Sequence, residues 1–458
     1  MKTFIRSSVA LVLLMTIFSC KNGDRPKYQK STTTLLPELE KSLEELVQVW
    51  YPKSMDSVHG GFWSDFNYKW EKEGKQHKML VSQARHIWTT ATLSMYYKDH
   101  VYEQMAQHGF EFLRDVMWDK AYGGFHTLFE IDTNSLKLVS KGKSAYGNSF
   151  AIYGLATYYK ASKDTAALEL AKETFRWLEN HSHDSIYGGY FDVMAQNGDW
   201  LLEQGEDLGY DNFIRKNWKD QNSSIHLLES FTALYEVWPN QLLKERLQEL
   251  LVLVRDTITS NKGYLYLHQE RDWTPVSFRD SSETYRQDNF YLDHVSFGHD
   301  VETAFLMLEA SHRLRIKNDS ITRRKAKKMV DHALEWGWDH EKGGFFDGGY
   351  YHKDGTRKIE NEAKVWWAEA EALNSLLLMA GLFPEEKSYY TLFTKQWEYI
   401  SNYLIDTEYG GWYVEGLDTD PNAKTKAKAH IWKVNYHNIR SLINVIHMIK
   451  GEFQLTAH

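Results

Sequence analysis

Six short stretches of the chain carry ionisable or aromatic side chains immediately before an apolar run that is typical of a buried helix. One of them is SFGHDVETAFLMLEA, in which His299, Asp300 and Glu302 precede the apolar residues. An imidazole can take or give a proton near neutral pH, and paired carboxylates can act as acid and base. These residue types at the mouth of one helix therefore indicate either proton-transfer chemistry or hydrolysis.

The other five stretches place comparable groups at the start of their own apolar runs. The candidate residues are Arg85, Tyr146, Asn222 and His226, His299 and Glu302, Trp367 and Glu371, and Trp432 and His437. One residue taken from each stretch gives steps of 61, 80, 73, 68 and 70 positions. If the six helices run in the same direction, groups that recur in phase converge on one end of one ring and form a shared site.

A glycine motif recurs with the same period. In its copies, such as HGGFWSDF and YGGYFDVM, the first glycines are Gly60, Gly123, Gly188, Gly263, Gly343 and Gly410. Paired glycines followed by aromatic residues predict a tight turn that leads into a short extended segment.

The sequence between these turns has two kinds of helical pattern. Residues 167–181 and 321–338 carry an apolar stripe, whereas residues 149–159 and 370–380 are apolar nearly all round. A striped helix has one solvent face, and a helix without a polar face is buried on every side. The pattern predicts an all-α (α/α)6 barrel, with short β segments in the loops at one end. An open solenoid is the alternative, and the irregular spacing between Gly188 and Gly343 favours the closed barrel.

Composition limits the classes of partner. The formal net charge is −8, which argues against a nucleic-acid partner because such a protein needs a basic face. The chain has 17 Trp and 28 Tyr, which fits either a Trp-rich helical core or a groove that stacks on the apolar faces of sugars.

The N-terminus has the pattern of a bacterial lipoprotein precursor. Residues 1–19 read as a signal peptide, and Cys20 follows in the lipobox-like stretch IFSC. We expect residues 20–36 to form a lipidated cysteine and flexible tether, and residues 37–458 to form a single catalytic barrel domain. The membrane contact is then only through the lipid on Cys20, and the protein is periplasmic or on the cell surface. Its oligomeric state is not indicated.

Several chemistries fit the convergent groups. No HExxH pattern, Cys/His cluster or phosphate-binding loop is present, and we expect neither a metal nor a cofactor. A glycoside hydrolase could use two carboxylates from Asp300, Glu302 and Glu371. Alternatively, His299 and His437 could flank a sugar, with one removing the proton at C2 of an open-chain aldose. A proton returned to the opposite face inverts C2, and a proton returned at C1 gives a ketose. A glycan-binding protein without turnover is a third possibility.

The chain resembles the N-acylglucosamine 2-epimerase superfamily, and within it the cellobiose 2-epimerases. The resemblance is carried by QARHIW, YGNSFAIYGL, NSSIHLLES, SFGHDVE, VWWAEAEAL and WKVNYHNIR, and it spans about residues 37 to 450. It implies an (α/α)6 barrel that needs no metal or nucleotide. It also implies a small oligosaccharide substrate, such as a β-1,4-linked disaccharide of the cellobiose or mannobiose type.

The resemblance also implies roles for the candidate residues. His299 and His437 would be the acid/base pair, His226 would aid ring opening, and Glu302 would orient an imidazole or catalyse ring opening. The remaining candidates would contact the sugar: Arg85, Tyr146 and Asn222 at its oxygens, Trp367 and Trp432 by stacking, and Glu371 at its hydroxyls.

Three positions depart from the pattern of the cellobiose 2-epimerases, and we expect them near the sugar. Ser224 stands where a second histidine is common, Phe305 where a tryptophan is common, and Glu369 where a glutamine is common. An aldose–ketose isomerase or an N-acylglucosamine 2-epimerase of the same superfamily therefore stays open beside the disaccharide epimerase.

Overall fold

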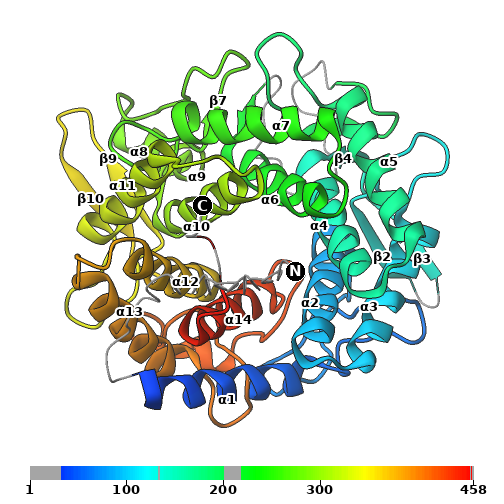
Figure 1. Ribbon diagram of the computed structural model, residues 1–458, viewed down its shortest axis with the longest axis horizontal. Coiled ribbons are helices and arrows are strands. Elements are labelled where there is room, and N and C mark those ends of the chain that lie inside the picture. The colour runs from blue at the N-terminus through cyan, green and yellow to red at the C-terminus, as the bar shows by residue number, and fades with distance from the viewer. Residues whose placement is uncertain (1–31, 133–134, 201–217, 454, 456–458) are drawn as a thin grey trace, which may run out of the picture.

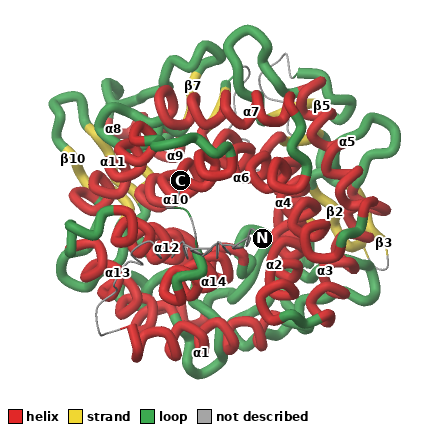
Figure 2. Tube along the Cα trace, in the orientation of Figure 1, coloured by secondary structure: helices red, strands yellow, loops and turns green. Residues whose placement is uncertain are grey.

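The computed structural model describes residues 32–132, 135–200, 218–453 and 455. Its helices form two concentric rings, with inner helices surrounded by outer ones (Figure 1). Figure 2 shows that the described strands and loops lie mostly outside the inner ring. The predicted (α/α)6 barrel with short β segments is confirmed.

Six helices form the inner ring, and each contacts the inner helices on both sides, with the last returning to the first. They are α2 (Leu80–Tyr97), α4 (Ala145–Ser162), α6 (Gln221–Val237), α10 (Phe297–Arg313), α12 (Trp366–Leu382) and α14 (Tyr436–Lys450). Helix α12 illustrates why they are buried, because every residue from Ala368 to Met379 lies in the core.

Six amphipathic helices form the outer ring. They are α1 (Thr32–Trp50), α3 (His100–Phe112), α5 (Thr165–His181), α7 (Gln241–Val252), α11 (Ser320–Trp336) and α13 (Ser388–Tyr399). Helix α1 packs on α14, the last inner helix, and so closes the ring between the two ends of the chain. Helices α3, α7 and α13 each continue into a π-helical turn, at Leu113–Met117, Leu253–Ile258 and Ile400–Leu404.

Each glycine motif forms the turn from an outer helix to the next inner helix. All six first glycines have positive φ values, which confirms the predicted tight turns. At Gly124, φ is 67° and a Cβ atom would lie 2.7 Å from the Trp177 ring, so the position requires glycine for both conformation and space.

A buried ion pair fastens five of the six turns. An aspartate four positions before the first glycine accepts from a lysine that lies shortly before the next inner helix. The pairs are Asp56 with Lys78, Asp119 with Lys143, Asp184 with Lys219, Asp339 with Lys364, and Asp406 with Lys428. We did not predict these pairs, although the recurring DxxxGG spacing is visible in the sequence.

A side-chain hydrogen bond from the fourth residue of an inner helix also holds four of the glycine turns. The side-chain oxygen of that residue accepts the backbone N–H two positions after the first glycine of the turn. The four cases are Gln83 with Phe62 at 2.7 Å, Asn148 with Phe125 at 2.9 Å, Asp300 with Leu265 at 2.9 Å, and Glu369 with Phe345 at 3.0 Å.

Short strands link neighbouring repeats at the end of the ring where the inner helices begin. They are β1 (Lys78–Met79), β2 (Leu128–Asp132), β3 (Ser135–Leu138), β4 (Gly142–Ser144), β5 (Val193–Ala195), β6 (Lys219–Asp220), β7 (His268–Gln269), β8 (Val295–Ser296), β9 (Gly348–Tyr351) and β10 (Arg357–Asn361). The segment before each inner helix pairs antiparallel with the segment after the next glycine turn, as in β1 with β2 and β8 with β9. The bridge from Phe66 to Ala429 completes this series around the ring.

The fourth repeat is the irregular one. Its glycine turn is one residue shorter, and Ser260, whose carbonyl accepts from Gly263 N, stands in the structure where the other repeats have aspartate. Val295 stands where they have lysine, so both partners of the ion pair are replaced together. The connection before α10 also contains two short helices, α8 (Glu283–Asp288) and α9 (Phe290–Asp293).

The predicted signal peptide and Cys20 lie outside the described residues. Helix α1 begins at Thr32, so the last five positions of the predicted tether, residues 32–36, are helical. Among the described residues, no helix is both long and apolar enough to cross a membrane.

Candidate active site

The candidate residues lie in two layers at the beginnings of the inner helices. The second helical position supplies Tyr146, Asn222, Trp367 and His437, and the sixth supplies Arg85, His226, Glu302 and Glu371. Positions two and six are four residues apart and share one helix face, whereas position four points the opposite way. The structure therefore directs these predicted groups toward one end of the ring, with His299 at the third position of α10.

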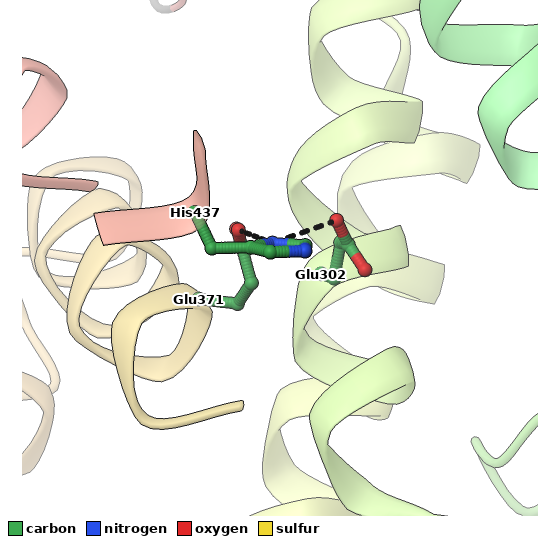
Figure 3. Close-up of side chains that lie close together, drawn as sticks. All are labelled: Glu302, Glu371 and His437. Carbon is green, nitrogen blue, oxygen red and sulfur yellow. Dashed lines mark hydrogen bonds and ion pairs between the residues drawn. The ribbon is translucent and has the colours of Figure 1, made fainter. Parts of the chain in front are cut away.

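His437 is held from behind by carboxylates. Its Nδ1 atom lies 2.7 Å from Glu371 Oε1 and 3.8 Å from Glu302 Oε1. Figure 3 shows the imidazole between these two side chains. Burial lowers the pKa of His437 well below its usual value, which favours the neutral ring. Because Glu371 Oε1 also accepts from Arg440, the imidazole donates its Nδ1 proton, and Nε2 carries the free lone pair.

Arg440 connects the helices behind the site. Its Nη2 atom lies 2.5 Å from Glu302 Oε1 and 2.6 Å from Glu371 Oε1, and its Nη1 atom contacts Glu229 and the Tyr436 hydroxyl. One guanidinium therefore bridges carboxylates from α6, α10 and α12, all of them buried. This arrangement fixes the positions of three inner helices relative to α14.

Glu229 joins His226 to the same network. His226 Nδ1 lies 2.9 Å from Glu229 Oε2, and Tyr436 donates its hydroxyl to the other carboxylate oxygen. Burial alone would raise the pKa of Glu229, but the charge of Arg440 and the His226 hydrogen bond lower it to about 2. Glu229 is thus an ionised acceptor, and it holds His226 as Glu371 holds His437.

His299 has a different partner. Its Nδ1 atom lies 2.9 Å from the Ser296 hydroxyl, and burial lowers its pKa well below the usual value, with nearby histidines adding to the effect. The ring contacts the Trp367 indole, with 4.6 Å between centroids, and His437 contacts the same indole at 5.8 Å. The two predicted acid/base imidazoles therefore lie against one shared aromatic side chain, each with Nδ1 engaged and without a hydrogen bond to Nε2 from the described residues.

Arg85 lies at the same mouth. Its Nη2 atom donates to the Tyr146 hydroxyl at 3.1 Å, its Nη1 atom donates to the Trp432 carbonyl at 3.4 Å, and its guanidinium stacks over Phe150. Tyr146 also contacts the rings of His226 and Trp432. Asn222 Oδ1 is buried without a hydrogen-bond partner among the described residues, so it is available as an acceptor.

The site contains both half-buried and buried groups. Tyr146, Asn222, His299, Trp367 and Trp432 are half-buried, whereas Arg85, His226 and His437 are buried, as are the carboxylates of Glu229, Glu302 and Glu371 and the guanidinium of Arg440. Glu371, which we expected at the sugar hydroxyls, has its Oε1 atom behind His437.

The structure places the three residues that depart from the family pattern, Glu369, Ser224 and Phe305, away from the mouth. Glu369 is at the fourth position of α12, where it accepts from Phe345 N and Gln396 Nε2, so its side chain faces the fifth turn. Ser224 is at the fourth position of α6 and donates to the Asp220 carbonyl. Phe305 is buried beneath the network, with its ring 5.8 Å from the Arg440 guanidinium carbon. Asp300, a candidate hydrolytic carboxylate, holds the fourth turn.

A metal ion bound at Glu302, Glu371 and His437 would compete with Arg440 for the same carboxylate oxygens. Glu302, Glu371 and His437 bring ligand atoms within 4.8 Å of one another, which is compatible with a metal ion. However, Arg440 Nη2 already contacts Oε1 of both glutamates. The positive charge that these carboxylates require is thus supplied by the chain.

Three supporting residues were missed in the sequence: Glu229, Tyr436 and Ser296. A signal existed for the first, because His226 and Glu229 stand three residues apart on a helix, a spacing at which side chains meet. His437 and Arg440 share that spacing. Tyr436 and Ser296 had no distinguishing pattern.

Comparisons with known proteins cover nearly the whole chain. A family model described as N-acylglucosamine 2-epimerase matches residues 61–441. A cellobiose 2-epimerase of Dictyoglomus turgidum is 24% identical over 421 residues, which cover 91% of this chain and 99% of the relative. A D-mannose isomerase of Marinomonas mediterranea is 24% identical and covers 89% and 96%. The structure of a cellobiose 2-epimerase from Spirochaeta thermophila is similar with a TM-score of 0.75 and 26% identity, covering 92% of this chain and 98% of that one.

Proposed function

The chain belongs to the N-acylglucosamine 2-epimerase family and is a sugar epimerase, and we propose that it inverts C2 of the reducing-end aldose of a β-1,4-linked disaccharide of the cellobiose or mannobiose type. The observation that carries this proposal is the contact of His299 and His437 with the same Trp367 indole. Two imidazoles with free Nε2 atoms at one position can serve the two faces of a single carbon.

The reaction begins with the open-chain aldose, whose C2 proton is acidified by the neighbouring C1 carbonyl. One imidazole removes this proton, and the electrons move into a cis-enediolate. The other imidazole then donates a proton to the opposite face of C2. The first ring ends protonated and the second ends neutral, so the enzyme exchanges these protons with water before the next turnover.

The two histidines differ in how well they hold a proton. The His437 imidazolium faces Glu371 and Glu302, whereas Nδ1 of His299 meets only a neutral hydroxyl. When the pair holds one proton, electrostatics therefore place it on His437. In that state His299 is the base and His437 is the acid.

The enediolate oxygens require positive charge or hydrogen-bond donors. Arg85 and Tyr146 lie together at the mouth, and His226 lies against Tyr146. Arg85 donates to the half-buried Tyr146, whereas Arg440 is committed to the buried carboxylates. We assign Arg85 to the enediolate and His226 to ring opening, in which its Nε2 relays a proton at the anomeric hydroxyl and ring oxygen.

Trp367 and Trp432 are half-buried indoles at the opening, and they can stack on sugar rings. A disaccharide offers two rings, one over the imidazoles and one toward the rim. This favours a disaccharide over a single aldose.

The decisive experiment incubates the purified protein with cellobiose and with mannobiose in heavy water and follows C2 by NMR. The expected result is deuterium at C2 together with the C2 epimer. His437→Asn and His299→Asn are the matched variants, and each should abolish inversion. Absence of C2 exchange with every disaccharide tested would contradict the proposal.

An aldose–ketose isomerase is the second candidate, favoured by the likeness to the D-mannose isomerase. The same enediolate gives a ketose when the proton returns to C1. The same NMR experiment separates the two activities, because the ketose loses the aldehyde-derived anomeric signals. Hydrolysis is less well supported, since Glu302 and Glu371 both contact Arg440 Nη2 instead of standing free on either side of a bond. Release of new reducing ends would favour it.

We also propose that the protein is a lipoprotein anchored through Cys20. Support comes from the position of α1: outer helices run opposite to inner ones, so Thr32 begins at the end of the ring remote from the site. A lipid attached through a short tether would then leave the mouth unobstructed. Labelling cells with a palmitate analogue tests this, with Cys20→Ser as the control that should lose the label.

A further inference from the structure

Ser296 is the last residue of β8 and the N-cap of α10. An N-cap serine ordinarily accepts a backbone N–H from the first turn of its helix. Ser296 makes no such bond, and its hydroxyl lies 2.9 Å from His299 Nδ1 instead. The first turn of α10 therefore lacks a side-chain cap, and the hydroxyl serves an imidazole.

The chain contains a matched serine with the ordinary behaviour. Ser144 is the last residue of β4 and the N-cap of α4, and its hydroxyl accepts Gly147 N at 2.9 Å. In both helices the partner is the third helical residue. Gly147 has no side chain, so the hydroxyl meets the backbone; His299 has an imidazole, and the hydroxyl meets the ring.

We propose that Ser296 is a positioning residue for the acid/base chemistry of His299, an inference that rests on the proposed epimerase function. The hydroxyl fixes the ring by Nδ1 and leaves Nε2 toward the substrate. Ser296 is buried, so water does not replace this contact readily. Trp367 is the aromatic neighbour of His299 among the described ring contacts, and it provides packing without a hydrogen bond.

The contrast with His437 makes this role specific. His437 is fixed by Glu371 and the Arg440 network, which does not involve Ser296. Loss of the Ser296 hydroxyl should therefore impair proton transfers through His299 and spare those through His437. In a two-base reaction, each C2 epimer presents its proton to a different imidazole.

The two epimers should then respond differently to Ser296→Ala. From the epimer that His437 deprotonates, the enediolate forms normally but is slow to receive a proton from His299. It returns to the starting epimer through His437, which has exchanged with solvent. From the other epimer, deprotonation itself is slow, and the enediolate goes on to product.

The test compares wild type and Ser296→Ala in heavy water, starting from each purified epimer. NMR gives the ratio of deuterium in recovered substrate to deuterium in product. We expect inversion to slow on the order of tenfold in both directions. The ratio should rise several-fold from one epimer only. Ser296→Thr keeps the hydroxyl and should restore the wild-type ratio.

Ser144→Ala is the matched control, because it removes a true cap on a neighbouring inner helix. It should lower Tm by about 2 °C and leave both exchange ratios unchanged. Ser296→Ala should lower Tm less, since no cap is lost. This opposite pattern of stability and exchange separates positioning from a structural role.

Two results would overturn the role of Ser296 while the unaltered enzyme still inverts C2. One is an unchanged or equally changed ratio from both epimers, and the other is loss of all C2 exchange in a folded Ser296→Ala protein. No C2 exchange by the unaltered enzyme would overturn the proposed function itself, and the role of Ser296 with it.

Discussion

The Nδ1 atom of His437 lies 2.7 Å from Oε1 of Glu371, and Arg440 contacts the same carboxylate oxygen at 2.6 Å. This relationship makes Glu371 a support for an imidazole. In the proposed reaction, the carboxylate fixes the tautomer, presents Nε2, and stabilises the imidazolium that forms when His437 takes a proton.

Glu371→Gln should therefore lower kcat on the order of 100-fold with little change in KM, because a neutral amide cannot stabilise the imidazolium. Steady-state kinetics on the disaccharide epimer pair measure both constants. A raised KM with wild-type kcat would instead favour a direct contact of Glu371 with sugar hydroxyls.

Arg440→Met should destabilise the fold by about 3–5 kcal/mol, because it leaves three buried carboxylates without their shared cation. Urea unfolding at neutral pH measures the loss. Arg324→Met is a suitable control, since Arg324 is an exposed residue of α11 and its removal should change stability by less than about 0.5 kcal/mol. Equal effects of both substitutions would refute the proposed importance of the network.

Lys143→Val should cost about 3–5 kcal/mol, because the buried carboxylate of Asp119 would lose the lysine that pairs with it. The double variant Asp119→Ser with Lys143→Val should recover a large part of this loss, since the fourth repeat already has Ser260 and Val295 at these two positions. Denaturation of the single and double variants measures the coupling. If the stability losses of the two single variants add up to the loss of the double variant, Asp119 and Lys143 do not stabilise the fold as a pair.

Glu369→Gln should flatten the dependence of stability on pH. Burial raises the pKa of Glu369 to about 8, against an ordinary value of 4.5, so folding favours the protonated acid. That stabilisation is complete below pH 4.5 and is lost as the pH rises from 4.5 through about 8. Glutamine cannot ionise and occupies the same position as Gln83 in α2. Urea unfolding from pH 5 to pH 9 should show a smaller slope for the variant, and an identical slope would contradict the raised pKa.

The sequence was sufficient for the repeat, the two rings and the level at which the candidate residues lie, because hydrophobic period and glycine spacing are local properties. It did not tell us which way each residue of a helix mouth faces. Asp300 and His299 are neighbours, yet Asp300 holds a turn while His299 faces Trp367. The register with Gln83, Asn148 and Glu369 could have revealed this, since all four stand at the same position of their helices.

The contacts that cross between repeats were harder to predict. Arg440 meets Glu229 across more than two hundred positions, and only the relative rotation of the packed helices decides which carboxylates its guanidinium reaches. Ser296 was missed for another reason. A serine directly before a helix is expected to cap that helix, and nothing in the sequence indicates that its hydroxyl contacts His299 instead.

The packing of α1 against α14 has a consequence for synthesis of the protein. His437 and Arg440 are on α14, which follows the other five inner helices in the chain, and those five helices present an open edge until α14 docks. A chain interrupted directly before α14 can hold every site residue outside that helix and still be inert. Translation products that stop before α14 therefore lack His437 and Arg440 and should not interconvert sugars.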